Sequence, residues 1–231
     1  MQLSMTPPRL VITTGTLNAL KWLALACMAG DHVNKYLLND SIPGLFATGR
    51  LALPIFLFAI AYNLARPDTL KNGVYLRVMQ RLLFFGVIAS VPFIALGGLL
   101  AGWWPLNVLF TLLALVTTLY WIDRGSLFLA GIVFLIGGSS VEFWWPAIIF
   151  GVAVWAYCRK PTWSAVIVAI LACSALWIIN RNMWAIAALP LILAASSVDV
   201  NFPRCRYIFY GFYPAHLIVI LLFKKASFLF A

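Results

Sequence analysis

Two histidines and their polar neighbours are the residues whose types and spacing could do chemistry in this sequence. His32 directly follows Asp31 in an otherwise apolar stretch, LNALKWLALACMAGDHV, and Lys35 comes four residues after Asp31. His216 lies in a second apolar stretch, FYPAHLIV, three residues after Tyr213. Imidazole is the side chain best suited to exchange protons near neutral pH. The pattern therefore indicates proton transfer inside an apolar environment.

Basic side chains extend this set. Lys21 lies eleven residues before His32, and at about 100° per residue this spacing places both on nearly the same face of a helix. Arg50, in FATGRLALPIF, is expected at a depth similar to that of His32, where it could act at a site or simply neutralise Asp31. Arg77 and Arg81 lie one helical turn apart and could hold phosphate groups. Basic residues at a helix end are also ordinary topology anchors, so both interpretations stay open for this pair.

The remaining polar residues have structural interpretations as well. Asp31 could orient a histidine, or it could simply neutralise Lys35 four residues later. Asn107 and Tyr213 could act at a site, but such residues often form hydrogen bonds between membrane helices. Glu142 falls in a predicted loop, where we expect it to be solvated. A charge inside a membrane helix costs about 2.5–3.5 kcal/mol on insertion scales, which favours a functional reason for keeping it.

The composition shows what kind of elements must position these groups. Of the 231 residues, 64% are hydrophobic and 10% are charged, whereas soluble domains are about half apolar and a quarter charged. Apolar stretches of about 18 residues or more recur, and each is long enough to cross a bilayer. Backbone hydrogen bonding in lipid then requires helices. The sequence predicts an all-α, polytopic transmembrane bundle with a single domain over residues 1–231.

Charged residues, glycine and proline divide the chain into about nine spans, within a range of eight to ten. The fifth and sixth are short and could instead form a re-entrant pair around GGSSVEFWWP. The first is expected to be retained, not cleaved as a signal peptide. The four cysteines lie singly and are expected to be small buried residues without a metal site. The predicted spans lie near residues 17–37, 44–64, 77–98, 105–121, 126–139, 143–157, 163–179, 183–198 and 206–223.

The net charge of +10 comes from short basic clusters between apolar runs, which is typical of membrane topology and argues against a nucleic-acid partner. Eleven basic residues fall on one side of the predicted membrane and five on the other. The positive-inside rule then places the N-terminus in the cytoplasm. Lys224 and Lys225 are exceptions, because a count of nine spans places them on the less basic side of the membrane. An even number of spans would place them on the cytoplasmic side. Four tryptophans at 103–104 and 144–145 would lie at the outer interface.

Five stretches of the chain resemble the TraX family of inner-membrane proteins, which are encoded with conjugative transfer genes and acetylate the N-terminus of pilin. They are LKWLALACMAGDHVNKYL, TGRLALPIFLFAIAYNLAR, YLRVMQRLLFFGVIASVP, WWPLNVLFTL and FYPAHLIVI. This family is in turn similar to the acyltransferase-3 membrane acyltransferases, where a basic residue precedes an essential histidine by the spacing of Lys21 and His32. The wider family usually has arginine where this chain has Lys21, and lysine lacks the bidentate fork of arginine.

The resemblance implies an acyltransferase-3-like fold and acetyl transfer from cytoplasmic acetyl-CoA to the N-terminal amine of pilin. It also implies a location in the bacterial inner membrane, in contact with membrane lipids. His32 would act as general base, with Asp31 orienting it and Arg50 or Asn107 stabilising the oxyanion. A route through a transient acetyl-histidine is equally compatible. The residues assigned to catalysis are His32, Asp31, Arg50 and His216. Those assigned to binding acetyl-CoA are Lys21, Arg77, Arg81, Asn107 and Tyr213.

Two other functions are compatible with these residues. A proton-coupled transporter would also place histidine and aspartate inside the membrane, but transporters often contain paired repeats and the DH and GR segments have no second copy. A non-enzymatic assembly partner of pilin would need apolar packing faces, yet no histidine at two separate membrane depths. The residues favour the enzyme over both alternatives.

Overall fold

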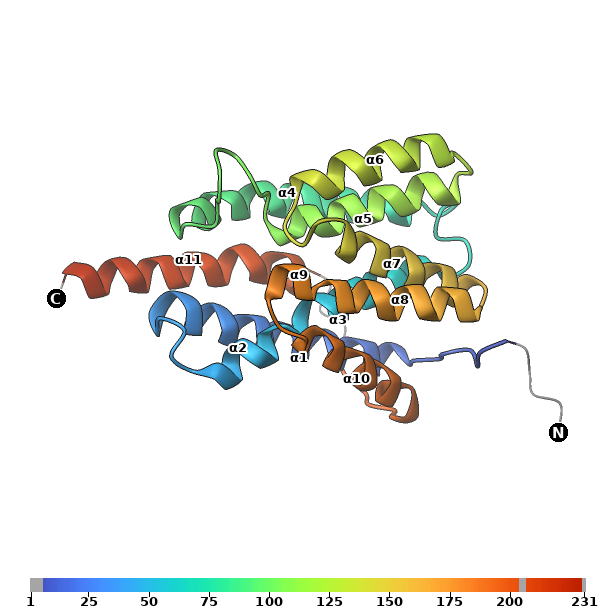
Figure 1. Cartoon of the computed structure of the whole chain (residues 1–231), viewed down its shortest axis with the longest axis horizontal. Coiled ribbons are helices and arrows are strands. Elements are labelled where there is room, and N and C mark those ends of the chain that lie inside the picture. The colour runs from blue at the N-terminus through green and yellow to red at the C-terminus, as the bar shows by residue number, and fades with distance from the viewer. Residues whose placement is uncertain (1–5, 204–206, 230–231) are drawn as a thin grey trace.

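The computed structural model describes residues 6–203 and 207–229 and is built from helices that run mostly along one axis (Figure 1). Arg204, Cys205 and Arg206, which the sequence analysis counted, lie outside the described residues. In chain order the helices are α1 (Thr14–Leu37), α2 (Pro43–Gly49), α3 (Ala52–Leu64), α4 (Val74–Ala95), α5 (Val108–Asp123), α6 (Leu127–Ser140), α7 (Trp144–Arg159), α8 (Trp163–Ala175), α9 (Trp177–Asn180), η1 (Trp184–Ala187), α10 (Ala188–Ala194), η2 (Ala195–Ser197) and α11 (Ile208–Leu229).

Short helices follow one another closely in three places, so the described residues form nine helical rods at the nine predicted positions. Helix α2 leads into α3, α8 into α9, and η1 into α10 and η2. Helices α6 and α7 are two separate, unbroken helices joined by the turn 141–143. Within the described residues, four segments could cross a membrane by length and composition: Pro43–Leu64, Val74–Ala95, Trp163–Asn180 and Ile208–Ala226. The all-helical membrane fold is thus confirmed.

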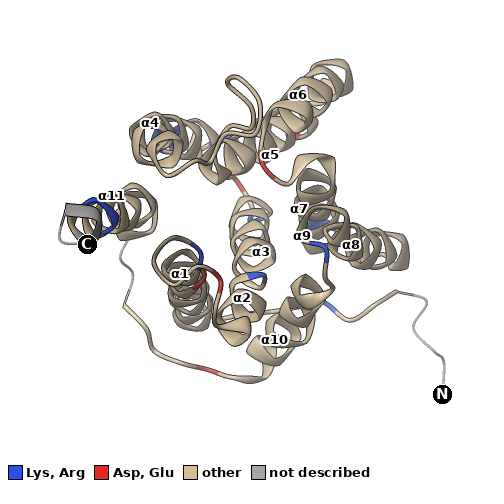
Figure 2. Cartoon of the chain, turned by 60° about the vertical axis from the view of Figure 1, so that its left-hand side comes forward, with Lys and Arg blue, Asp and Glu red and all other residues tan. Residues whose placement is uncertain are grey.

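Helix α3 occupies the centre of the bundle, between α1, α5, α7 and α10 (Figure 2). Its sequence, ALPIFLFAIAYNL, is apolar on nearly every face, and nine of its thirteen residues are buried. A helix that is apolar all round is typical of such a central position. By contrast, α4 exposes one apolar face that includes Phe84, Val87 and Val91, as expected of a helix in contact with lipid.

Helices α1 and α11 lie side by side and run in the same direction, although their sequences are far apart (Figure 1). The extended segment before α11 packs onto the start of α1: the Thr16 hydroxyl donates to the Val198 carbonyl oxygen at 2.8 Å and accepts from the Val200 N–H at 3.0 Å. Gly15 allows this close approach, because a Cβ atom there would lie 2.0 Å from the Val200 oxygen. These contacts place α11 along α1 and bring His216 to the level of His32. The expectation that the two histidines lie at separate membrane depths is therefore wrong, because their rings are in contact.

The loops at one end of the bundle carry most of the basic residues, as the sequence predicts. Arg66, Lys71, Arg124 and Lys160 follow α3, α5 and α7 at the end where α1 begins (Figures 1 and 2). The first described helix begins at that end and the last helix ends at the other, which agrees with nine rods and leaves Lys224 at the less basic end.

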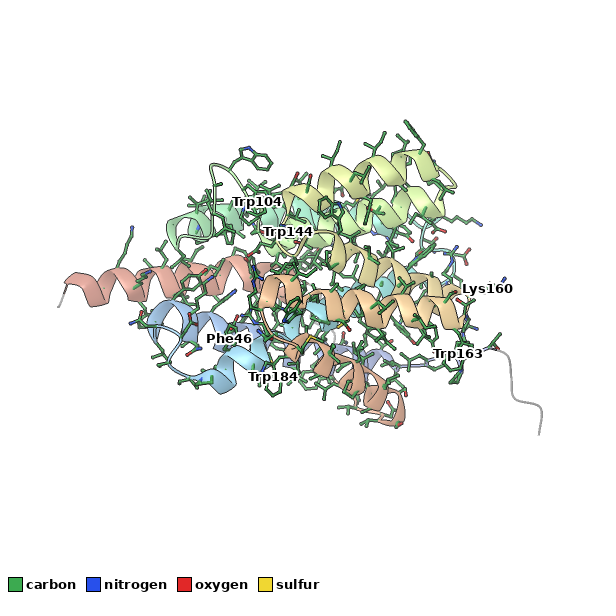
Figure 3. All side chains as sticks on the ribbon, viewed as in Figure 1. Phe46, Trp104, Trp144, Lys160, Trp163 and Trp184 are labelled. Carbon is green, nitrogen blue, oxygen red and sulfur yellow. The ribbon has the colours of Figure 1, made fainter. Side chains whose placement is uncertain are left out.

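Whereas Trp163 lies near Lys160, several aromatic side chains lie toward the opposite end of the bundle. Figure 3 shows Trp104 and Trp144 close together there, with Phe46 and Trp184 at a similar level. The ring centroids of Trp104 and Trp144 are 5.8 Å apart. Tryptophan is typical of the membrane–water interface, so this arrangement agrees with the predicted aromatic belt.

Candidate functional site

A cavity of about 150 Å³, which we call the histidine cavity, lies between α1, α3, α5 and α11 and is bordered by the α6–α7 turn. Its walls are apolar over most of their length, with a few polar groups in between. Sites for small ligands usually combine an apolar lining with a few such groups. The polar and charged residues that line it are Asp31, His32, Lys35, Arg50, Glu142, Asn180 and Tyr213.

The two histidines contact each other directly, although the sequence separates them by 184 residues. His32 Nδ1 and His216 Nε2 are 2.6 Å apart, and the two rings are parallel with centroids 4.9 Å apart. On its other side, His216 Nδ1 lies 2.8 Å from the Phe212 carbonyl oxygen. His32 lines the cavity and His216 stands behind it, so the two form a chain that leads from the cavity into α11.

This series of hydrogen bonds determines which ring nitrogens carry protons when both histidines are neutral. A carbonyl oxygen only accepts hydrogen bonds, so His216 Nδ1 carries a proton and donates it to Phe212. His216 Nε2 is then an acceptor, and His32 Nδ1 must carry the proton between the two rings. His32 Nε2 is left with a free lone pair. In this tautomer His32 can accept a proton at the cavity.

Asp31 does not orient His32, contrary to the expectation from their adjacency. Its carboxylate Oδ2 forms an ion pair with Arg50 Nη2 instead. Consecutive side chains on a helix point about 100° apart, so Asp31 faces α2 while His32 faces α11. The predicted orienting role of Asp31 is therefore wrong, and His216 occupies the place beside His32.

Arg50 is held on several sides by the groups around it. Besides Asp31, its Nε donates to the Phe46 carbonyl at 3.4 Å, its Nη1 reaches Asn180 Oδ1 at 3.5 Å, and its guanidinium covers the Phe46 ring at 4.6 Å. Gly49 permits the close contact of α2 with α1, because a Cβ atom there would lie 2.3 Å from the Asp31 Cβ. Arg50 lines the cavity, but much of its charge is neutralised by Asp31.

A second cavity of about 340 Å³, which we call the basic cavity, lies toward the end of the bundle where the basic loops gather. Lys21, Arg77 and Arg81 line it together, as the sequence predicts, and Arg66 at the end of α3 joins them. Arg66 was not singled out, although its position at a predicted helix end was a usable signal. Four basic side chains around one cavity create a strongly positive potential, which attracts anionic ligands.

Apolar side chains are shared by the two cavities. Phe56, Leu109, Leu112 and Phe209 line both. The ammonium group of Lys21 lies 4.4 Å from the centroid of the Phe209 ring. The histidine cavity and the basic cavity are therefore neighbours across an apolar wall, one toward each end of the bundle.

Asn107 and Tyr213, both assigned to acetyl-CoA binding, do not lie at the basic cavity. Asn107 lines neither cavity: it caps α5 by accepting from the Leu109 N–H at 3.1 Å, and its amide donates to Gly86 and Ser90 of α4 at 3.0 and 3.2 Å. Both its amide hydrogens are thus used between helices, so the oxyanion role is not available to it either. Tyr213 is buried in the wall of the histidine cavity, with its ring centroid 5.5 Å from that of His216.

Glu142 lies in the α6–α7 turn, as expected for a loop residue, but it is only partly exposed and lines the histidine cavity. The turn that carries it is anchored by its own backbone: its N–H donates to the Leu106 carbonyl at 2.9 Å, and its carbonyl accepts from the Thr111 hydroxyl at 2.6 Å. Burial raises the pKa of the Glu142 carboxyl to about 7, and nearby Lys35 and Arg50 oppose this increase. The signal in the sequence was a single acidic residue among aromatic and apolar ones, GGSSVEFWWP.

The cysteines show no arrangement for redox or metal chemistry within the described ranges. Cys173 is buried, Cys27 and Cys158 are half-buried, and none of the three is paired. In residues 6–203 and 207–229 no group of three or more His, Cys, Asp or Glu side chains could hold a metal ion.

Comparison with known proteins identifies one family. The family model described as TraX protein matches residues 16–224, which include every residue of the two cavities except Thr14. No curated protein and no solved structure matches the chain.

Proposed function

This chain belongs to the TraX family, and from that premise we propose that it is an integral membrane acetyltransferase, which transfers acetyl from acetyl-CoA to the N-terminal amine of pilin. The observation that carries the proposal is the pair of neighbouring cavities. One offers cations that suit phosphate groups, and the other offers an imidazole with a free nitrogen. A thioester donor bound across the shared apolar wall would bring its acetyl group to that imidazole.

The basic cavity suits the nucleotide part of acetyl-CoA. Arg66, Arg77 and Arg81 can each form charge-assisted hydrogen bonds with phosphate oxygens, and Lys21 adds a further cation. Arg77 is already directed by a 2.8 Å bond from its Nη1 to the Asn72 carbonyl. The volume of the basic cavity, about 340 Å³, lies within the range of ligand sites, about 300–1,000 Å³. The thin pantetheine arm would pass between Phe56 and the other shared apolar residues.

In the histidine cavity, His32 acts as the general base. The acceptor amine attacks the thioester carbon, a C–N bond forms, and the amine proton moves to His32 Nε2. The positive charge on His32 is stabilised through its Nδ1–H bond to His216, much as a carboxylate stabilises the imidazolium in a hydrolase triad. His216 is thus a positioning residue. The C–S bond then breaks, and His32 returns the proton to the leaving thiolate.

The orientation of the molecule follows from where the donor is made. Acetyl-CoA is cytoplasmic, so the basic cavity faces the cytoplasm, as does the start of α1. This agrees with the basic loops at that end and with the positive-inside rule, in the bacterial inner membrane. The histidine cavity then opens toward the outer half of the membrane, where a membrane-embedded pilin would present its N-terminus. We also propose a relation to the acyltransferase-3 proteins, on the spacing of Lys21 and His32.

Reconstitution of the purified protein in vesicles tests the proposal. Pilin and acetyl-CoA are added, and mass spectrometry records whether the pilin N-terminus gains an acetyl group. We expect the gain with the wild type, a loss of about 100-fold or more in rate with His32→Ala, and a normal rate with Gln80→Ala, an exposed residue outside both cavities. Full acetylation by His32→Ala would overturn the assignment. No acetylation by any form would point to a transporter or an assembly partner.

A further inference from the structure

Glu142 is the acidic group of the histidine cavity that no cation neutralises by contact. Within the described parts of the chain, the ion pairs are Arg50 with Asp31 and Arg159 with Asp123. Glu142 lines the same cavity as His32 but makes no ion pair of its own. Its turn is anchored by the two backbone hydrogen bonds to α5 and the segment before it. The carboxyl is therefore held at the cavity by its own chain.

The groups that face Glu142 come from every element packed against this part of the cavity, and most of them are neutral or cationic. Asp31 is already paired with Arg50, which leaves Lys35 as the cation without an ion pair near Glu142. The backbone of Val108, in the first turn of α5, also favours the charged carboxylate, as helix N-termini do in general. The charged and titratable groups are Asp31, His32, Lys35 and Tyr36 of α1, Arg50 after α2, and Tyr213 of α11.

The proposed acetyl transfer has to remove two protons from the acceptor. A terminal amine has a pKa of about 8 and is mostly an ammonium ion at neutral pH. An ammonium ion has no lone pair, so one proton must leave before the attack and a second as the amide forms. His32 Nε2 can hold only one of them in each turnover. A second proton acceptor close to the first would let the cavity use the ammonium form, which is the major form at neutral pH.

We propose that Glu142 binds the ammonium group of the acceptor beside His32 and takes its first proton. This inference rests on the proposed function and adds to it a determinant of acceptor specificity. The carboxylate balances the ammonium charge, which would otherwise enter a cavity that already holds Lys35 and Arg50. The proton passes from nitrogen to the carboxylate oxygen and leaves a neutral amine and a neutral carboxylic acid. His32 receives the second proton during attack, and Glu142 releases the first to water after the product leaves.

The acid strength of Glu142 suits this exchange. Burial raises its pKa to about 7, close to that of a terminal amine, so proton transfer between the two is unfavourable by only about tenfold. An ordinary carboxylate, with a pKa near 4.3, would be a much poorer acceptor for the same proton. The raised pKa of Glu142 and its position in the same cavity as His32 both favour this role.

Glu142→Gln tests the inference, with Asp40→Asn as the matched control, since Asp40 is an exposed acid outside the cavity. Rates are measured across pH with two acceptors: a peptide of the pilin N-terminus, and the same peptide carrying a weakly basic amine that is neutral at pH 7. We expect Glu142→Gln to lose about tenfold in kcat/KM for the first acceptor at pH 7, because only about a tenth of an amine with a pKa near 8 is already neutral there. The deficit should shrink as the pH rises above the pKa of the amine, and the neutral acceptor should react at nearly the wild-type rate.

Other outcomes would overturn the inference. An equal loss with both acceptors at every pH would mean that Glu142 only supports the turn, and an unchanged rate would mean that it has no role. Glu142→Asp, which keeps the carboxyl, should recover the wild-type pH profile at least in part. Binding of the peptide without acetyl-CoA is measured as well. If the wild type acetylates neither acceptor, the proposed function fails. The binding measurement still tests the ammonium site in that case. Loss of peptide binding in Glu142→Gln alone would support the site, and unchanged binding would oppose it.

Discussion

Removing the second histidine gives a quantitative test of the histidine pair. When both rings are neutral, His32 Nδ1 donates a neutral hydrogen bond to His216 Nε2 across 2.6 Å. In the proposed reaction His32 takes the amine proton, and the same bond then has a charged donor. A neutral hydrogen bond contributes about 0.5–1.5 kcal/mol and one to a charged group about 1.5–3 kcal/mol. The difference of about 1–1.5 kcal/mol is gained only as the charge develops, so it lowers the activation barrier.

His216→Ala should therefore reduce kcat by about fivefold to tenfold and leave the KM for acetyl-CoA unchanged. His32→Ala removes the base itself and should cost about 100-fold or more. His216→Gln can still accept from His32 with its amide oxygen, and it should recover part of the loss. Steady-state acetylation in vesicles measures all three variants against the wild type.

Two results would refute this reasoning. If His216→Ala were as inactive as His32→Ala, while both proteins still eluted as the wild type does in size-exclusion chromatography, then His216 would be the base or an acetyl carrier. If His216→Ala changed nothing, the hydrogen bond between the rings would have no part in the reaction.

Three further predictions concern the basic cavity, the α1–α2 contact and Glu142. Arg81→Ala should raise the KM for acetyl-CoA about tenfold or more, since a charged hydrogen bond contributes about 1.5–3 kcal/mol, whereas Arg124→Ala, at the same end but outside the cavity, should not. Gly49→Ala should destabilise the protein by about 1–3 kcal/mol through overpacking and lower its Tm, whereas Gly44→Ala, where a Cβ meets nothing within 4 Å, should not. Because the pKa of Glu142 is raised in the folded state from 4.5 to about 7, the wild type should lose stability as the pH rises from about 4.5 to 7. Thermal melts of Glu142→Gln should lack this part of the pH dependence.

Much of the fold could be predicted because lipid allows the backbone few choices. Each long apolar stretch had to become a helix to satisfy its own hydrogen bonds, and the nine predicted stretches correspond to the nine rods. Helix ends were predictable for the same reason, since charged residues and glycine mark where the apolar stretches stop. The basic end of the bundle followed from simple counting. These features depend on residues near one another in the chain.

The candidate site was predictable in its membership but not in its contacts. Lys21, Arg77 and Arg81 were expected together and line one cavity. Asn107, at an equally suggestive position, proved to be an N-cap with both amide hydrogens bound to α4. Glu142 was missed because a loop residue has no periodic pattern from which to infer its direction. The sequence indicates well how deep in the membrane a helical residue lies, but it says little about which residues of other helices contact it.

The sequence by itself determined that this is a helical membrane protein with two histidines and a basic end. Only the tertiary structure decided that His32 meets His216 and that Asp31 turns to Arg50. Adjacent residues on a helix diverge by about 100°, so nearness in sequence misleads at this short range. The partner of His32 lies 184 residues away, and its position depends on how the extended segment before α11 packs against Thr16. Such contacts arise from packing many segments at once, and no local pattern records them.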